Sequence, residues 1–81
     1  MSSQQEIRTF IEQVLREKGD LRPIGDTDSL MLSGRLESID VLGIIMFLER
    51  RFGLNFARIG FDQTQLDSIQ LIDELVQSHA S

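Results

Sequence analysis

The sequence predicts an all-α fold, and two observations lead to this prediction. Apolar residues recur with the spacing of helix faces in three segments of the 81 residues, while the alternation typical of β-strands is nowhere sustained. Glycine, proline and capping residues separate these segments, where turns are expected. No internal repeat or linker divides the chain, so we expect residues 1–81 to form a single domain.

The first predicted helix begins at Ser3, which forms a capping-box pattern with Glu6. One face of this helix is apolar and comprises Ile7, Phe10, Ile11, Val14 and Leu15. Gly19 is its expected C-terminal cap. Turn-forming residues dominate positions 20–36 and predict a long loop. The residues expected to anchor this loop to the core are Leu30, Leu32 and Leu36.

A second helix is predicted from about Ser38 to Phe52, with Gly53 ending it. Its apolar residues cover two faces. One face suffices to join the core and comprises Val41, Ile44, Ile45, Leu48 and Phe52. The second row consists of Ile39, Leu42 and Met46. Periodicity alone leaves two explanations open for this row, either burial at the centre of the bundle or exposure to partners.

The C-terminal third of the chain predicts one minor helix and one longer helix. The segment Ala57–Phe61 has room for a short helical turn only. Asp67 and Gln70 then form a capping-box pattern, and Leu66 and Leu71 occupy the two positions of a hydrophobic staple. The buried stripe of this last helix is predicted to contain Ile69, Ile72, Leu75 and Val76.

The composition excludes several classes of function. Eight Lys and Arg against thirteen Asp and Glu give a formal charge of -5, which disfavours nucleic acid, including binding by a helix-turn-helix, and anionic membranes as partners. Cysteine is absent, which excludes disulfides and thiolate metal sites and favours the cytoplasm. The N-terminus lacks the features of a signal peptide, and no apolar run approaches a membrane span. We therefore expect a cytoplasmic, monomeric protein.

Catalytic patterns are also missing from the sequence. The single histidine, His79, lies close to the end of the chain, and no glycine-rich phosphate loop is present. The carboxylates are numerous, but so short a bundle offers little volume for a pocket that would shift their pKa values. We therefore expect a non-catalytic protein.

Ser38 stands at the predicted start of the second helix, within Gly34-Arg35-Leu36-Glu37-Ser38-Ile39-Asp40. One interpretation makes Ser38 an ordinary N-cap, whose hydroxyl accepts a backbone N–H. Val41 occupies the position where Glu or Gln would reinforce such a cap. The other interpretation is an exposed hydroxyl beside the positive end of a helix dipole, which would favour an attached phosphate.

The segment Glu37-Ser38-Ile39-Asp40 resembles the acyl and peptidyl carrier family, in which a modified serine follows an acidic residue and opens the second helix. The resemblance extends over nearly the whole chain. It includes Asp28-Ser29-Leu30 in the long loop and Phe47-Leu48-Glu49-Arg50-Arg51-Phe52-Gly53 at the end of the second helix. It implies an acyl-carrier-like bundle of three main helices plus one short helix, with the long loop between the first and second helices.

The resemblance also implies a function. A phosphopantetheinyl transferase would attach 4'-phosphopantetheine from coenzyme A to Ser38, and the terminal thiol would carry an acyl or aminoacyl group as a thioester. The partners would be acyl- or aminoacyl-activating and acyl-transferring enzymes. The implied apolar contacts are Ile39, Leu42 and Met46, and the implied charged contacts are Glu37, Asp40 and Glu49. Fatty acid, polyketide, nonribosomal peptide and D-alanyl pathways all remain open.

Some residues differ from the usual family pattern. Glu37 replaces an Asp, Ile39 replaces a Leu or Met, and Gly43 stands where an acidic residue is often found. Arg50 and Arg51 make the end of the second helix basic. These differences favour a free-standing, dedicated carrier that serves a specialised pathway. The alternative from another class is an unmodified helical module that binds one protein through its apolar face.

A second serine motif has a different interpretation. Asp67-Ser68-Ile69 matches an Asp-Ser pattern more literally than Glu37-Ser38-Ile39 does. Its position near the end of the chain differs from that of the family's serine, and a role at the start of the last helix explains it. We therefore assign the modification to Ser38 and a structural role to Ser68.

Overall fold

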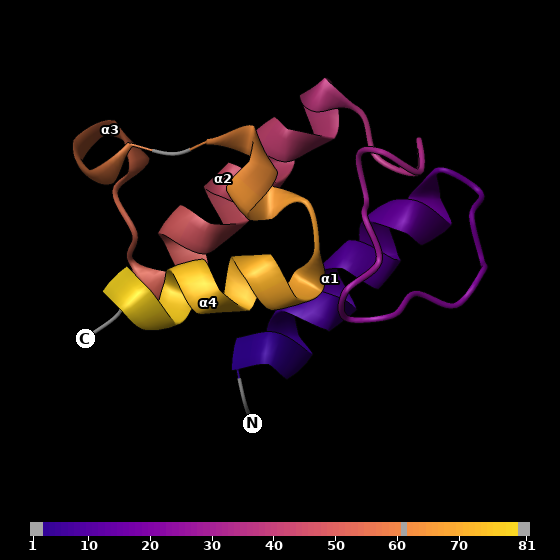
Figure 1. The fold of residues 1–81 in the computed structure, drawn as a ribbon, viewed down its shortest axis with the longest axis horizontal. Coiled ribbons are helices and arrows are strands. Elements are labelled where there is room, and N and C mark those ends of the chain that lie inside the picture. The colour runs from indigo at the N-terminus through magenta and orange to yellow at the C-terminus, as the bar shows by residue number, and fades with distance from the viewer. Residues whose placement is uncertain (1–2, 61, 80–81) are drawn as a thin grey trace.

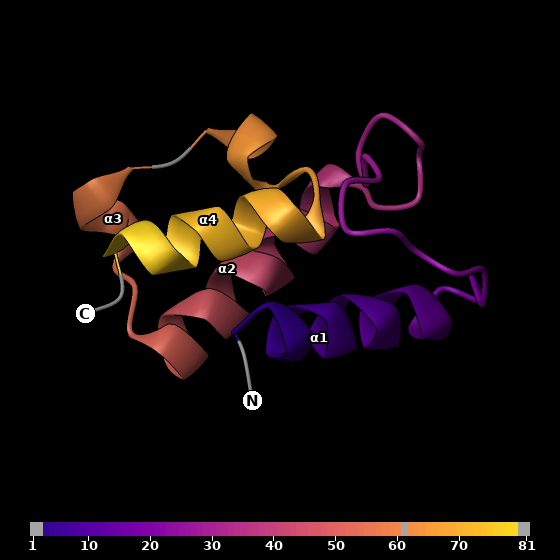
Figure 2. The same ribbon diagram turned by 60° about the horizontal axis from the view of Figure 1, so that its bottom comes forward.

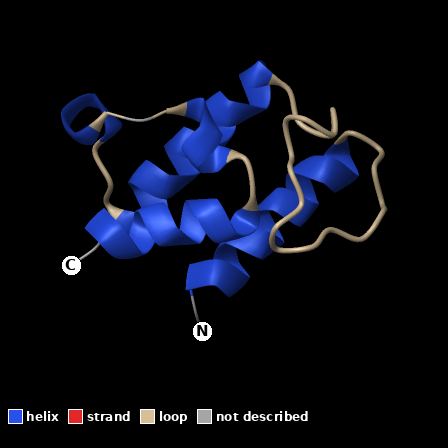
Figure 3. Ribbon diagram, in the orientation of Figure 1, coloured by secondary structure: helices blue, strands red, loops and turns tan. Residues whose placement is uncertain are grey.

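The computed structural model describes residues 3–60 and 62–79, so Phe61, the last residue of the predicted short turn, lies outside the described residues. Three long helices make up most of this part of the chain: α1 (Ser3–Glu17), α2 (Ser38–Phe52) and α4 (Ile69–His79). A short helix α3 (Phe56–Ile59) and a 3₁₀ turn η1 (Gln63–Leu66) connect α2 to α4 (Figures 1 and 3). No strand occurs in the described residues, which confirms the all-α prediction.

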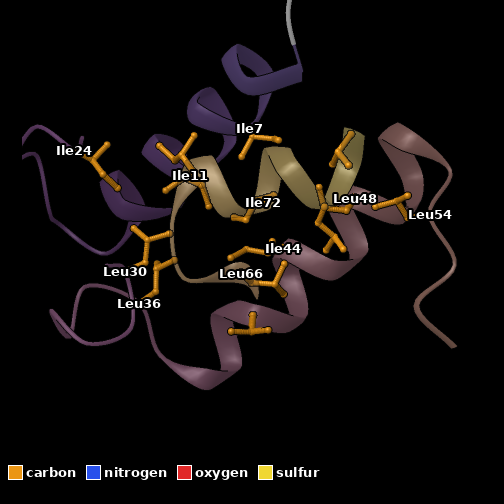
Figure 4. Close-up of a cluster of buried hydrophobic side chains, with 14 of the residues drawn as sticks. Ile7, Ile11, Ile24, Leu30, Leu36, Ile44, Leu48, Leu54, Leu66 and Ile72 are labelled. Atoms are coloured by element: carbon orange, nitrogen blue, oxygen red, sulfur yellow. The ribbon is translucent and has the colours of Figure 1, made fainter. Parts of the chain in front are cut away.

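The core lies where α1, α2 and α4 meet. Ile7, Ile11 and Leu15 of α1 are buried on one face, while Phe10 and Val14 pack beside them and are partly buried. Apolar side chains from all three helices, the long loop and η1 converge in this core (Figure 4). The stripe predicted for α4 is buried throughout; it consists of Ile69, Ile72, Leu75 and Val76. These residues keep helical spacing because one face of each helix must leave water.

The long loop between α1 and α2 occupies one end of the bundle, and α3 occupies the opposite end (Figures 1 and 2). Leu30 and Leu36 anchor this loop as predicted, and Ile24 is a third anchor that was not predicted. The prediction for Leu32 is wrong, because its side chain is 89 % exposed. The Leu36 N–H donates to the Leu30 carbonyl at 3.0 Å and closes a short turn between these two anchors. Leu32, Ser33 and Gly34 are exposed at the tip of this turn.

Polar contacts fix the loop to the helices. Arg35 is only 8 % exposed; it donates to Asp20 at 2.9 Å and to the carbonyls of Arg22 and Pro23. Hydrogen bonds to the Asp20 carboxyl from Arg22, and then from Arg35, hold the pKa of this carboxyl far below its usual range. Arg35 therefore joins the end of the loop to its beginning, immediately before α2 begins.

The starts of α1 and α4 differ from the predicted capping boxes. The Ser3 hydroxyl donates to Asp73 of α4, so it links two helices instead of capping its own. At α4, Ser68 is the cap, because its hydroxyl accepts the Leu71 N–H at 3.1 Å. Asp67 instead accepts hydrogen bonds from the Ser29 hydroxyl at 2.6 Å and from the Met31 N–H at 2.8 Å.

The hydrophobic staple predicted at the start of α4 is also not formed as expected. Leu66 is buried, but Leu71 is partly exposed. The reason is the shift of the cap from Asp67 to Ser68, which moves every later residue by one position relative to the helix start. The turn η1 was not predicted either, although Asp62 and Gln65 form a capping box around it. None of the described helices is long and apolar enough to cross a membrane.

Candidate functional site

The candidate site is the N-terminal turn of α2, which follows directly after the closed loop. Glu37, not Ser38, is the N-cap residue of α2. The Glu37 N–H donates to Asp40 Oδ2 at 2.9 Å, and the Asp40 N–H donates to the Glu37 carbonyl at 2.9 Å. An acidic residue three positions after the N-cap satisfies an otherwise unpaired backbone donor. The interpretation of Ser38 as an ordinary N-cap is therefore wrong.

Ser38 is the first residue within α2, and its side chain is exposed. Within residues 3–60 and 62–79, no group forms a hydrogen bond with its hydroxyl. The hydroxyl lies at the positive end of a helix of 15 residues, where a negative group such as a phosphate is stabilised. The arrangement thus presents an exposed hydroxyl, without a hydrogen-bond partner among the described residues, at the first position of a long helix.

The second apolar row of α2 is exposed. The exposed fractions are 70 % for Ile39, 61 % for Leu42 and 58 % for Met46, so the alternative of burial on all sides is wrong for this row. The opposite face of α2 joins the core through Val41, Ile44 and Leu48. Because residues four apart lie above one another on a helix, Ser38, Leu42 and Met46 follow one line along the surface of α2. Ser38 stands at the head of that line.

Asp40 is less available to partners than the sequence suggested. Lys18, just after α1, places its Nζ 2.9 Å from Asp40 Oδ2 and 3.9 Å from Glu37 Oε2. Although partial burial by itself would raise the pKa of the Asp40 carboxyl, the Glu37 N–H and the Lys18 ammonium hold this pKa below its usual range. Asp40 therefore fixes the start of α2 and its charge is locally compensated, while Glu37 remains largely exposed.

Glu49 has a structural contact as well, because its Oε2 accepts the Phe56 N–H of α3 at 3.2 Å. Arg51, two residues later, pairs with Glu6 of α1. Among the six residues predicted to contact partners, the structure thus brings Glu37, Ile39, Leu42 and Met46 to the surface around Ser38. Asp40 and Glu49 also hold neighbouring elements in place.

Sequence reasoning did not identify two residues that shape the site. Lys18 reaches Asp40 across 22 positions, and Arg35 fixes the loop that leads into Glu37. Periodicity gives no signal for either contact, since both depend on how the loop folds back. The pair Glu37 and Asp40, in contrast, shows the spacing of a capping box and could have been found.

Comparison of the chain with protein-family models, with curated proteins and with solved structures finds no match.

Proposed function

We propose that the protein is an acyl carrier with an acyl-carrier-like arrangement of its helices, which bears 4'-phosphopantetheine on Ser38. The observation that carries the proposal is the exposed Ser38 hydroxyl, which has no hydrogen-bond partner in the described part of the chain. Because Glu37 and Asp40 cap α2, an N-cap role does not explain the presence of Ser38. The motif Glu37-Ser38-Ile39-Asp40 supplies the reason to expect modification rather than an idle hydroxyl.

The chemistry at Ser38 is the formation of a phosphodiester. A transferase would remove the proton from Oγ, which would then attack phosphorus in the pyrophosphate of coenzyme A, and the adenosine bisphosphate would leave. When bound, the arm supplies a thiol that holds an acyl or aminoacyl group as a thioester, which a chain without cysteine cannot provide. The N-terminal N–H groups of α2 would stabilise the negative charge of the phosphodiester next to Ser38.

The apolar row of α2 supports the partner side of the proposal. The exposed apolar row begins beside Ser38 with Ile39 and continues along α2 with Leu42 and Met46. An enzyme that binds the phosphopantetheine arm would therefore contact these side chains. Exposed apolar side chains in a row are typical of protein interaction sites. We propose that acyl- or aminoacyl-activating and acyl-transferring enzymes bind here, with Glu37 as the exposed charged contact, in a dedicated pathway of the cytoplasm.

The test is intact-mass measurement after incubation with coenzyme A and a promiscuous phosphopantetheinyl transferase. The wild-type chain should gain the mass of one phosphopantetheine, Ser38→Ala should gain none, and Ser68→Ala should gain as much as the wild type. Circular dichroism of both variants controls for folding, which matters because Ser68 is buried. If folded Ser68→Ala gains no phosphopantetheine mass while Ser38→Ala does, the modified residue is Ser68 and the assignment to Ser38 is wrong.

The alternative is an unmodified helical interaction module, and the same apolar row would serve it. The two functions differ in one observable. A chain that accepts no arm from several transferases, and carries none when purified from its own host, is a module and not a carrier.

A further inference from the structure

A second surface feature lies away from Ser38, between α1 and the C-terminal half of α2. It is a groove lined by Phe10, Gly43, Met46, Phe47, Arg50 and Arg51, which we call the α1–α2 groove. Large side chains bridge the two helices here: the rings of Phe10 and Phe47 stack with their centroids 4.2 Å apart, and Arg51 pairs with Glu6. The groove is thus a mostly apolar strip with arginines at one end.

No contact among the described residues requires a glycine at position 43. A methyl group placed on its Cα would meet no atom within 4 Å beyond its own helix backbone and chain neighbours, so close packing inside the described protein does not require a glycine. Glycine inside a helix costs about 1 kcal/mol relative to alanine. Because it has no side chain, Gly43 leaves room for another backbone or a ligand to approach α2 closely.

The lining residues contributed by α2 have the spacing of one helix face. Gly43, Met46, Phe47 and Arg50 stand at i, i+3, i+4 and i+7, and therefore form a continuous strip parallel to the α2 axis. Such a strip begins at a low point, the glycine, and continues with bulkier side chains, so it can accommodate a side-chain ridge of another helix. An apolar strip of this kind is the usual receptor surface for an amphipathic helix.

The charges of the groove indicate the sign of the partner. Arg50 is exposed and has no hydrogen-bond or ion-pair partner among residues 3–60 and 62–79, whereas Arg51 is paired with Glu6 and lies over the Phe52 ring. The described residues that line the groove include no carboxylate, although the whole chain carries a formal charge of -5. This local positive end favours an acidic partner, since complementary charges select and orient partners.

We propose that the α1–α2 groove binds an amphipathic helix of a partner protein. An apolar side chain of this helix lies over Gly43 and against Met46 and Phe47, and an Asp or Glu next to it pairs with Arg50. Binding of this helix does not require phosphopantetheine on Ser38, so the proposal is independent of the proposed carrier function. The exposed charge of the groove, Arg50, is positive, whereas the exposed charge at the Ser38 end of α2, Glu37, is negative.

The test is selection from a display library of helical peptides on the intact chain, followed by affinity measurement and NMR mapping with the selected peptides. We expect peptides with an apolar face flanked by Asp or Glu, which perturb the amides of Phe10, Gly43 and Phe47. Arg50→Glu and Gly43→Gln should each weaken binding about tenfold, and replacing the acidic peptide residue by Lys should restore binding to Arg50→Glu.

Three variants serve as controls. Arg58→Glu, which makes the same change of charge on α3, should keep affinity within about twofold. Gly43→Ala, which adds only a methyl group at the point of close approach, should weaken binding less than Gly43→Gln does. Ser38→Ala should bind like the wild type, so that failure of the carrier proposal leaves this one intact. Circular dichroism confirms folding of each variant.

Several outcomes would overturn the proposal. These are the absence of enriched helical peptides, enrichment of basic ones, or binding that Gly43→Gln and Arg50→Glu leave unchanged. Sedimentation that reveals a dimer dissociated by Arg50→Glu would also overturn it, because the occupant would then be a second copy of the chain.

Discussion

The starts of α2 and α4 carry nearly the same tripeptide in opposite environments. Glu37-Ser38-Ile39 and Asp67-Ser68-Ile69 each place an acidic residue before a serine and an isoleucine. Ser38 is exposed, its hydroxyl has no hydrogen-bond partner among the described residues, and Ile39 is 70 % exposed. Ser68 is 5 % exposed and caps α4, and Ile69 is fully buried. The comparison teaches that a serine motif gains its role from the packing around it, not from its neighbours in sequence.

The acidic residues explain part of this difference. Asp67 holds the long loop through Ser29 and Met31, so it cannot cap α4, and the cap passes to Ser68. At α2 the roles are reversed, because Asp40 and Glu37 complete the cap between them. The hydroxyl of Ser68 thereby caps α4, whereas the hydroxyl of Ser38 is not needed to cap α2.

The largest expected difference concerns the two isoleucines. Ile69→Ala should lower the free energy of unfolding by about 2–5 kcal/mol, because it removes a fully buried side chain. Ile39→Ala should change it by less than about 0.5 kcal/mol, because that side chain is mostly in water. Urea titration measures both. A loss at Ile39 as large as that at Ile69 would place Ile39 in the core and remove it from the partner surface.

A smaller difference is expected between the serines themselves. Ser68→Ala should cost about 1 kcal/mol of stability, since the Leu71 N–H loses its acceptor. Ser38→Ala should stay within about 0.5 kcal/mol of the wild type, since no described residue uses its hydroxyl. Thermal unfolding of the two unmodified variants, side by side, gives the answer. Equal losses would mean that Ser38 does cap α2.

The smallest effect is one of pH, and it should distinguish the two helix starts. The pKa of Asp40 is lowered in the folded chain, so its stabilising contribution is complete above the pKa of an unfolded carboxyl, about 4, and is lost as pH falls through the folded value. A serine hydroxyl does not titrate in this range. Acid should therefore weaken the start of α2, by no more than about 1 kcal/mol, before that of α4.

Residue-resolved amide exchange at decreasing pH, corrected for the intrinsic rates, measures this effect at Glu37 and Leu71. In Asp40→Asn the protection of the Glu37 N–H should no longer depend on pH through this range. Parallel loss of protection at both amides in the wild type would contradict the assignment of the α2 cap to Asp40.

Helix existence and core composition could be predicted because both follow from local periodicity. The buried stripes of α1 and α4, and the glycine ends at Gly19 and Gly53, are found where the sequence placed them. Helix starts were less predictable, because Ser3, Asp67 and Ser68 all have capping side chains, and only their long-range partners decide which of them caps. The prediction for Leu32 was wrong for a similar reason: all three loop leucines were expected to anchor the loop, and only the folded loop decides which of them reach the core.

The sequence alone determined the all-α class, the three long helices, the acidic charge and the position of a serine before an apolar row. Only the tertiary structure decided that the row faces water, that no described residue binds the Ser38 hydroxyl, and that Lys18 and Arg35 hold the loop beside it. The physical reason is the separation in sequence over which each effect acts. Periodicity and capping patterns act between residues a turn or two apart, whereas exposure and hydrogen-bond choice depend on segments that folding brings together from distant positions.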